Sequence, residues 1–121
     1  MTPAYDDNNV FAKILRGEIP NTTVYEDDHV LAFDDINPQA PVHVMVIPKG
    51  KYVSMSDFAD NASDAEIAAL NRAVYQVAKI KKIAGTGYRV LSNIGNDGMQ
   101  EVPHLHLHVM GGTRLGPILC R

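Results

Sequence analysis

The stretch H-L-H-L-H-V at residues 104–109 alternates histidine with apolar residues. Side chains two residues apart on an extended strand lie on the same face. On a strand, Leu105, Leu107 and Val109 would therefore pack into a core while the three histidines share the opposite face. A strand with only a structural role would more cheaply carry threonine or valine at the histidine positions, because burial of an unpaired imidazole costs free energy. The stretch predicts a strand whose histidine face carries chemistry rather than a merely solvated surface.

The size and composition of the chain indicate one ordinary globular domain. The chain has 121 residues, of which 45% are hydrophobic and 21% are charged. We expect a single domain over residues 1–121. No apolar run approaches the roughly 18 residues of a membrane span, and residues 1–7 lack the basic start and apolar core of a secretory signal. We therefore expect a cytoplasmic protein that binds no membrane.

The charge and cysteine content exclude two further classes. The net charge of −3 argues against a protein that binds nucleic acid by broad neutralisation of phosphates. The single cysteine, Cys120, cannot form an internal disulfide and lies beside the end of the chain, where no base is near in sequence. We expect no role for it.

The rest of the chain predicts an α+β fold. Ser63 and Glu66 have the spacing of a capping box, and a long helix should follow with Gly85 at its far end. A short helix is expected at 9–16, and strands at 22–26, 30–33, 42–48, 87–93 and 104–109. The expected architecture is an antiparallel sheet of about five strands with one long helix and a short N-terminal helix. The long helix should cover the Leu105 side and leave the histidine face free.

Two chemistries suit the histidines. His104 and His108 would lie about 13 Å apart on a strand, too far to bind one metal ion through bonds of about 2 Å. A metal site would therefore need two of the three strand histidines together with His43, which stands out in the apolar segment 42–48. Alternatively, a neutral imidazole is a good nucleophile near neutral pH and could attack a phosphorus atom covalently. The spacing alone leaves both alternatives open.

The segment H-L-H-L-H-V-M-G-G at 104–112 resembles the histidine triad motif of the histidine triad (HIT) nucleotide-binding proteins. The resemblance extends to V-F-A-K-I-L-R-G-E-I-P at 10–20, to A-F-D-D-I-N-P-Q-A-P-V-H-V-M-V-I-P-K at 32–49 and to G-Y-R-V-L-S-N at 87–93. It is strongest to the Hint-like purine nucleoside phosphoramidases. It implies the HIT-like fold and a homodimer that hydrolyses AMP or GMP linked to an amine, without a metal or cofactor.

The resemblance also implies a role for each histidine. His106 would be the nucleophile that forms a nucleotidyl-histidine, His108 and His104 would support the phosphate and the ring orientation, and His43 would lie near His106. Asp35 would bind the ribose hydroxyls. The nucleotide pocket implied by the resemblance consists of Val10, Phe11, Ile14, Phe33, Asp34, Asp35, Ile36, Asn93, Glu101 and Val102.

The chain departs from its relatives at three places. Many bacterial relatives begin with a Cys-x-x-Cys pair that helps to bind zinc, and this chain has Asn9 and Ala12 there, so we predict no metal at this end. Glu101 stands where well-studied relatives carry a hydroxyl residue that assists the leaving amine. The C-terminal residues lack the tryptophan with which some relatives shape the partner's site, which leaves the leaving-group preference open.

Three other functions compete with the phosphoramidase. One is a nucleotide-binding regulatory protein, the second is a dinucleoside polyphosphate hydrolase, and the third is a zinc hydrolase that uses His43. The resemblance associates the polyphosphate hydrolases with a glutamine soon after the triad, and no glutamine follows Gln100 here.

Overall fold

A computed structural model describes residues 3–118 of the chain. It confirms the α+β class and the antiparallel sheet of five strands. The helices are α1 (Val10–Leu15), α2 (Met55–Asn61) and α3 (Asp64–Ile80), and the strands are β1 (Thr23–Glu26), β2 (Val30–Asp34), β3 (Val42–Pro48), β4 (Tyr88–Leu91) and β5 (Leu107–Gly111). Cys120 lies outside the described residues.

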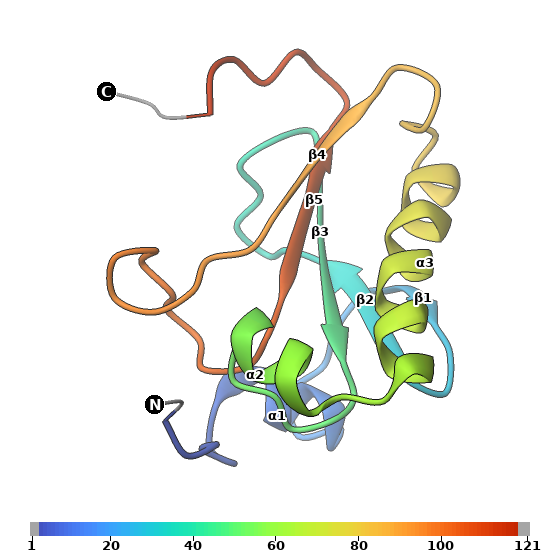
Figure 1. Cartoon of the computed structure of the whole chain (residues 1–121). Helices are drawn as coiled ribbons and strands as arrows, with labels where there is room; N and C mark the ends of the chain where they lie inside the picture. Colours follow the sequence, from blue (N-terminus) through green and yellow to red (C-terminus); the bar gives the residue numbers. More distant parts are fainter. Residues whose placement is uncertain (1–2, 119–121) are drawn as a thin grey trace.

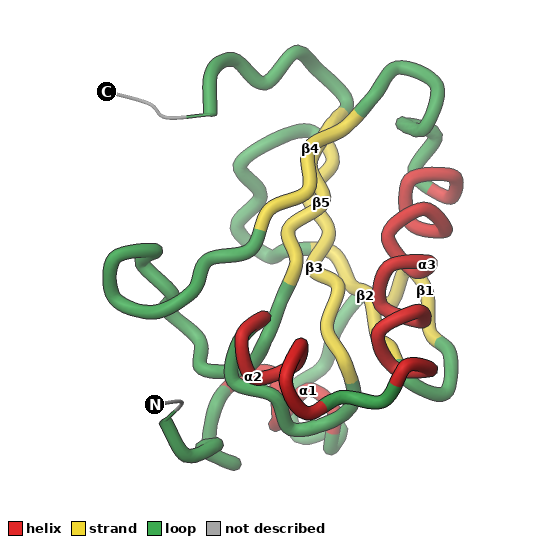
Figure 2. The backbone as a smooth tube through the Cα atoms, viewed as in Figure 1, coloured by secondary structure: helices red, strands yellow, loops and turns green. Residues whose placement is uncertain are grey.

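The five strands form one sheet in the order β1-β2-β3-β5-β4, and every neighbouring pair is antiparallel. The long helix α3 runs alongside the sheet, whereas α1 lies near the end of the sheet at which the chain begins (Figures 1 and 2). Strand β1 pairs with β2 and strand β4 pairs with β5, so β1 and β4 are the two edges of the sheet.

Alternation along the strands produces two separate apolar clusters. Residues such as Val44, Val46 and Val109 belong to a large cluster shared with α2 and α3. The intervening residues, such as Met45, belong to a smaller cluster with Phe11 of α1. The histidine side of the sheet is therefore partly covered by α1, and the expectation that this face is free was wrong. The first helix brings its apolar side chains to the histidines.

The helix α3 begins as predicted but ends earlier. The side chains of Ser63 and Glu66 form the expected reciprocal capping box. At the other end Lys82, not Gly85, takes the left-handed conformation with φ of 60°. The amide of Ile83 donates to the carbonyl of Ala78, the arrangement of a Schellman motif. Ile83 is only 3% exposed, and its burial requires the chain to turn at Lys82. The prediction of Gly85 as the cap was therefore wrong.

The histidine strand also starts later than the alternation predicts. β5 begins at Leu107, and Val46 opposite Leu107 is the last pair with β3. Backbone groups of alternate residues point towards β5, and the next such residue after Val46 is Pro48. A proline has no amide hydrogen with which to continue the pairing. The amide of Leu105 instead donates to the carbonyl of Tyr52 at 2.8 Å. His104 and His106 therefore lie before the strand, and only His108 lies on it.

Two further differences concern short segments. The helix α2 was not predicted, because Phe58 is its only buried residue and a single apolar position produces no periodicity. Strand β4 is shorter than the predicted 87–93, since its pairing with β5 stops at Leu91 opposite His108.

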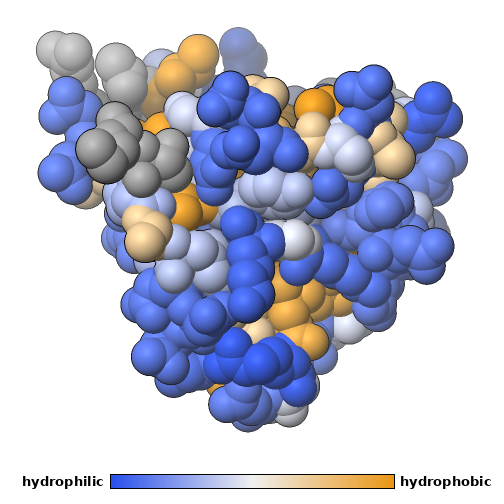
Figure 3. Space-filling view, turned by 60° about the horizontal axis from the view of Figure 1, so that its bottom comes forward, coloured by the Kyte–Doolittle hydropathy of each residue, from blue (hydrophilic) through white to orange (hydrophobic). Residues whose placement is uncertain are grey.

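No helix among residues 3–118 is long and apolar enough to cross a membrane. The face in Figure 3 is mostly hydrophilic, with a small apolar area between polar side chains.

Candidate active site

One cavity of about 670 Å³ opens on the histidine side of the sheet. Its walls come from α1, the ends of β2 and β3, β5 and the segment between β4 and β5. All but one of the fourteen site residues expected from the sequence line it: Val10, Phe11, Ile14, Phe33, Asp34, Asp35, Ile36, His43, Asn93, Glu101, Val102, His106 and His108. The exception, His104, is fully buried behind the cavity.

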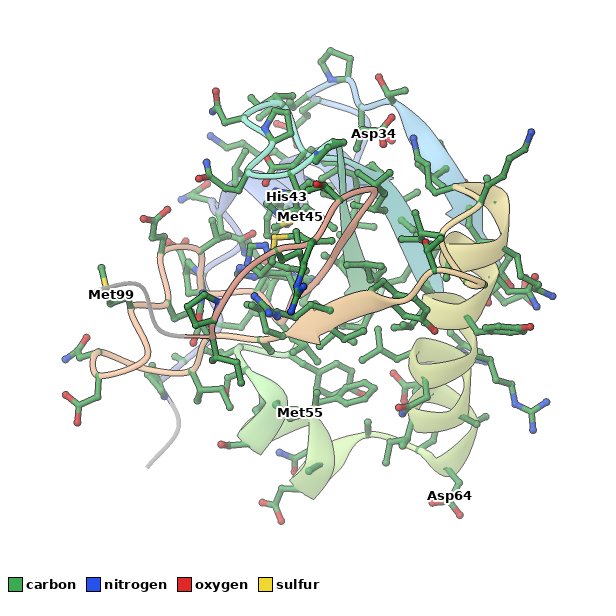
Figure 4. All side chains as sticks on the ribbon, turned by 90° about the horizontal axis from the view of Figure 1, so that it is seen from above. Asp34, His43, Met45, Met55, Asp64 and Met99 are labelled. Atoms are coloured by element: carbon green, nitrogen blue, oxygen red, sulfur yellow. The ribbon has the colours of Figure 1, made fainter. Side chains whose placement is uncertain are left out.

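Other lining residues were not singled out from the sequence. They are Ile19, Pro20, Asn21, Asn37, Gln39, Met45, Gly98 and Met99. Most belong to the segments that follow α1 and β2, where no periodicity or motif distinguishes them from ordinary loop residues. In Figure 4, His43 and Met45 lie together over the sheet, and Met99 lies out on the segment before the triad.

The ring of His106 has one tautomer available to it. Its Nδ1 atom lies 2.7 Å from the backbone carbonyl oxygen of His104. A carbonyl oxygen only accepts hydrogen bonds, so Nδ1 carries the proton and Nε2 carries a lone pair. The ring of Phe11 packs edge-to-face against the imidazole of His106, with 5.0 Å between the two ring centroids. His106 thus has the protonation pattern of an oriented nucleophile.

His104 supports this arrangement from behind. Its Nε2 lies 2.8 Å from the carbonyl oxygen of Pro48, so Nε2 carries the proton. Its Nδ1 is then an acceptor, and the Tyr5 hydroxyl donates to it at 2.6 Å. Tyr5, near the start of the chain, therefore reaches the triad across 99 residues of sequence. No pattern in the sequence pointed to this tyrosine.

His43 and His108 form a second oriented pair. The amide of Gln39 donates to Nδ1 of His43 at 3.0 Å, so the proton of His43 is on Nε2. That Nε2 lies 2.8 Å from Nδ1 of His108, which therefore accepts. The remaining proton of a neutral His108 is on its own Nε2, where it is a hydrogen-bond donor.

Burial keeps these imidazoles neutral. Removal from water, together with a smaller effect of neighbouring histidines, lowers the pKa of His104 and of His108 to about 4. Burial also lowers the pKa of His106 and of His43, although the charge of Asp35 opposes the shift at both. A neutral His106 retains the lone pair that a nucleophile needs.

The two adjacent aspartates have different surroundings. Asp35 Oδ2 lies 3.4 Å from Nε2 of His43, and Asp35 Oδ1 accepts from the amide of Asn37 at 2.9 Å. Asp34 instead forms an ion pair with Lys81, at 2.8 Å. Asp35 is thus held beside the histidines, whereas the charge of Asp34 is already balanced.

Within residues 3–118, one group of three side chains has the spacing that could bind a metal ion. Atoms of Asp35, His43 and His108 all lie within 4.8 Å of one another, although the closest of these atoms already share a hydrogen bond. This group contains one triad histidine, not the two that the metal alternative required. At the other place considered for zinc, the side chain of Asn9 accepts from the amide of Ala12 and caps α1.

Comparisons with known proteins show the family of the chain. The model of the HIT domain matches residues 16–115. The chain belongs to the HIT family. A 13.2 kDa HIT-like protein of Azospirillum brasilense is 60% identical over 121 residues, which is 100% of this chain and 99% of the relative. The purine nucleoside phosphoramidase of Escherichia coli K12 is 43% identical over 116 residues, covering 93% of this chain and 94% of the enzyme.

The solved structures have the same HIT fold. A HIT family hydrolase from Clostridium thermocellum superposes with a TM-score of 0.86 at 43% identity, covering 94% of this chain and 99% of the other. The recognition of the family from the triad motif is therefore confirmed.

Tyr5→Phe should lower the free energy of unfolding by about 1 kcal/mol, because it removes the hydrogen bond to His104 and keeps the ring. Urea unfolding measures this change. Tyr75→Phe is a matched control, since Tyr75 is 53% exposed on α3 and its hydroxyl forms no hydrogen bond among the described residues. Equal stabilities of the two variants would contradict the role of Tyr5.

Acid should destabilise the fold through the triad. In the unfolded chain a histidine has its ordinary pKa of 6.5, whereas His104 and His108 have folded values of about 4. Between these values the unfolded chain binds more protons, so stability is full above the unfolded pKa and is lost as the pH falls towards 4.

His108→Gln removes one titrating group and keeps an acceptor for His43. The free energy of unfolding should then fall less steeply with acid, by a slope of up to about one bound proton per molecule. Urea unfolding at a series of pH values measures both slopes. An NMR titration that placed the pKa of His108 at its ordinary value would contradict the expectation.

Proposed function

We propose that the protein hydrolyses purine nucleoside 5′-phosphoramidates, in which AMP or GMP is joined to an amine, through a nucleotidyl-histidine on His106. The observation that carries the proposal is the bond from Nδ1 of His106 to the carbonyl of His104, which leaves Nε2 as a lone-pair donor at the cavity. The family membership and the Escherichia coli relative named as a purine nucleoside phosphoramidase support the same reaction.

In the first step, Nε2 of His106 attacks the phosphorus and the bond between phosphorus and the amine breaks. The amine leaves with the electron pair of that bond and takes up a proton. The imidazole becomes cationic, and the carbonyl of His104, 2.7 Å from Nδ1, stabilises the positive charge.

In the second step, water attacks the phosphorus and His106 leaves as neutral imidazole. The products are the nucleoside monophosphate and the regenerated enzyme, and the proton of the water is released. In both steps the Nε2–H group of His108 would donate a hydrogen bond to a non-bridging phosphate oxygen, on which negative charge develops, and would keep its proton. His43 would hold His108 in the donating tautomer through their 2.8 Å hydrogen bond.

The nucleoside would occupy the part of the cavity next to α1 and β2. Phe11, Ile14 and Phe33 provide an apolar surface suited to a flat base. Asp35, on the segment after β2, offers a carboxylate that can accept from both vicinal hydroxyls of a ribose.

The charge of the cavity disfavours a dinucleoside polyphosphate as substrate. Within residues 3–118, the lining contains three carboxylate residues and neither lysine nor arginine. A chain of phosphates carries several negative charges that a cavity of this kind does not neutralise. A phosphoramidate carries one negative charge at the reacting phosphorus, which histidine donors can support.

His106→Ala should abolish hydrolysis of an adenosine 5′-phosphoramidate with a fluorescent amine, measured at steady state with excess chelator. The variant removes the nucleophile, so no covalent adduct can form. His29→Ala is a matched control, since His29 is exposed in the turn between β1 and β2. Acid quenching of the wild type should also leave a nucleotide mass on the peptide that contains His106.

Undiminished turnover by His106→Ala would contradict the proposal. If wild type and variant are both inactive but bind AMP, the protein is a nucleotide-binding regulatory protein instead. If added zinc restores activity to both, the reaction uses a metal and the covalent mechanism is wrong.

We also propose a homodimer in which β4 meets its counterpart in a second copy. Strand β4 lies at the end of the sheet, and Val90 is 43% exposed there. A regular, unpaired edge strand readily pairs with another chain. The opposite edge, β1, is less suitable because its register is irregular between Thr23 and Tyr25.

Val90→Lys should convert the dimer to a monomer, because a lysine on an edge strand opposes pairing with another edge. Sedimentation equilibrium should give twice the chain mass of 13.2 kDa for the wild type and 13.2 kDa for the variant. Thr23→Lys, on β1, should remain a dimer. A wild type that sediments as a monomer would contradict the proposed dimer.

A further inference from the structure

The three carboxylates of the cavity differ in how far their charge is already balanced. Asp34 is paired with Lys81 at 2.8 Å. Asp35 accepts from the amide of Asn37 at 2.9 Å and lies beside His43. Glu101 is exposed and takes part in no hydrogen bond or ion pair within residues 3–118. Glu101 is therefore the one carboxylate of the lining that has neither a hydrogen-bond partner nor an ion-pair partner among residues 3–118.

Glu101 also acts on the nucleophile. Both residues line the same cavity, and the negative charge of Glu101 raises the pKa of His106 against the effect of burial. Glu101 lies in the segment between β4 and β5, together with Gly98 and Met99 of the lining. This segment is separate in sequence from α1 and the end of β2, which would hold the nucleoside.

The position of Glu101 fits the leaving group. In a displacement at phosphorus, the leaving amine departs on the side away from the attacking Nε2 of His106. If the base and ribose bind beside Phe11 and Asp35, as proposed above, the amine and its substituents would extend towards the rest of the lining. Glu101 belongs to the part of the lining that comes from the segment between β4 and β5, and it is exposed, so a long substituent could reach it from the solvent.

A free carboxylate at this wall discriminates by charge. It attracts a substituent that carries an ammonium or guanidinium group and repels one that carries a carboxylate or phosphate. No lysine or arginine of the described part of the chain lines the cavity to reverse this preference.

We infer that Glu101 determines leaving-group specificity and selects phosphoramidates whose amine carries a second, cationic group, as in a diamine or a basic amino acid linked through its side chain. This inference rests on the proposed phosphoramidase activity and names the substrate class of that site.

Three adenosine 5′-phosphoramidates of equal length test the inference. Their amines are 1,4-diaminobutane, which keeps a free ammonium, 1-aminopentane, which has a methyl group there, and 4-aminobutanoate, which has a carboxylate. The wild type should give kcat/KM about fivefold higher for the cationic than for the neutral substrate, the size typical of an exposed ion pair. The anionic substrate should be the poorest, and the preference should shrink as salt is added.

Substitutions at Glu101 should change the ratio between substrates. Glu101→Gln removes the charge and should bring the cationic-to-neutral ratio of kcat/KM close to one, whereas Glu101→Lys should invert it. Asp97→Asn is the matched control, because Asp97 is an exposed carboxylate of the same segment that does not line the cavity. This control should keep the wild-type ratio, which excludes a general effect of net charge.

The failures of the two proposals are distinguishable. If the wild type hydrolyses all three substrates at one rate, the inference about Glu101 is overturned and the phosphoramidase remains. The same holds if Glu101→Gln keeps the wild-type preference, or if Asp97→Asn loses it. If the wild type hydrolyses none of the three, the proposed function is overturned and the inference with it.

Discussion

The hydrogen bond from Nδ1 of His106 to the carbonyl oxygen of His104, 2.7 Å long, is the interaction on which the site depends. It determines the tautomer of His106 and directs the lone pair of Nε2. The carbonyl must itself be held in place, and the ring of His104 achieves this through Pro48 and Tyr5. The orientation of one nitrogen atom is therefore tied to the end of β3 and to the start of the chain.

Pro48 has two effects on this arrangement. Because it has no amide hydrogen, pairing between β3 and β5 does not extend past Val46 and Leu107. Its carbonyl oxygen then accepts from Nε2 of His104. The same proline ends the ladder and supplies the acceptor that holds the first histidine of the triad.

Burial and nearby negative charge shift the pKa values of the cavity histidines in opposite directions. Low exposure lowers the pKa of the triad histidines and keeps them neutral, which suits a nucleophile and neutral hydrogen-bond donors. Asp35 and Glu101 oppose this effect at His106. Because no lysine or arginine among residues 3–118 lines this acidic cavity, support of a phosphate would depend on the oriented imidazoles. The ligand it fits best has little negative charge beyond the reacting phosphorus.

Local sequence determined the class of the fold and the identity of the chemical groups. Alternation over 104–109 and apolar strands such as 42–48 specify a sheet, and the capping box at Ser63 specifies where α3 begins, because periodicity and capping act between residues close in sequence. Tertiary structure decided the rest. The end of α3 at Lys82 follows from the burial of Ile83, the first triad residues leave the strand because of Pro48, and Tyr5 meets His104 across 99 residues. These features depend on packing and hydrogen bonds between distant segments, which no local pattern encodes.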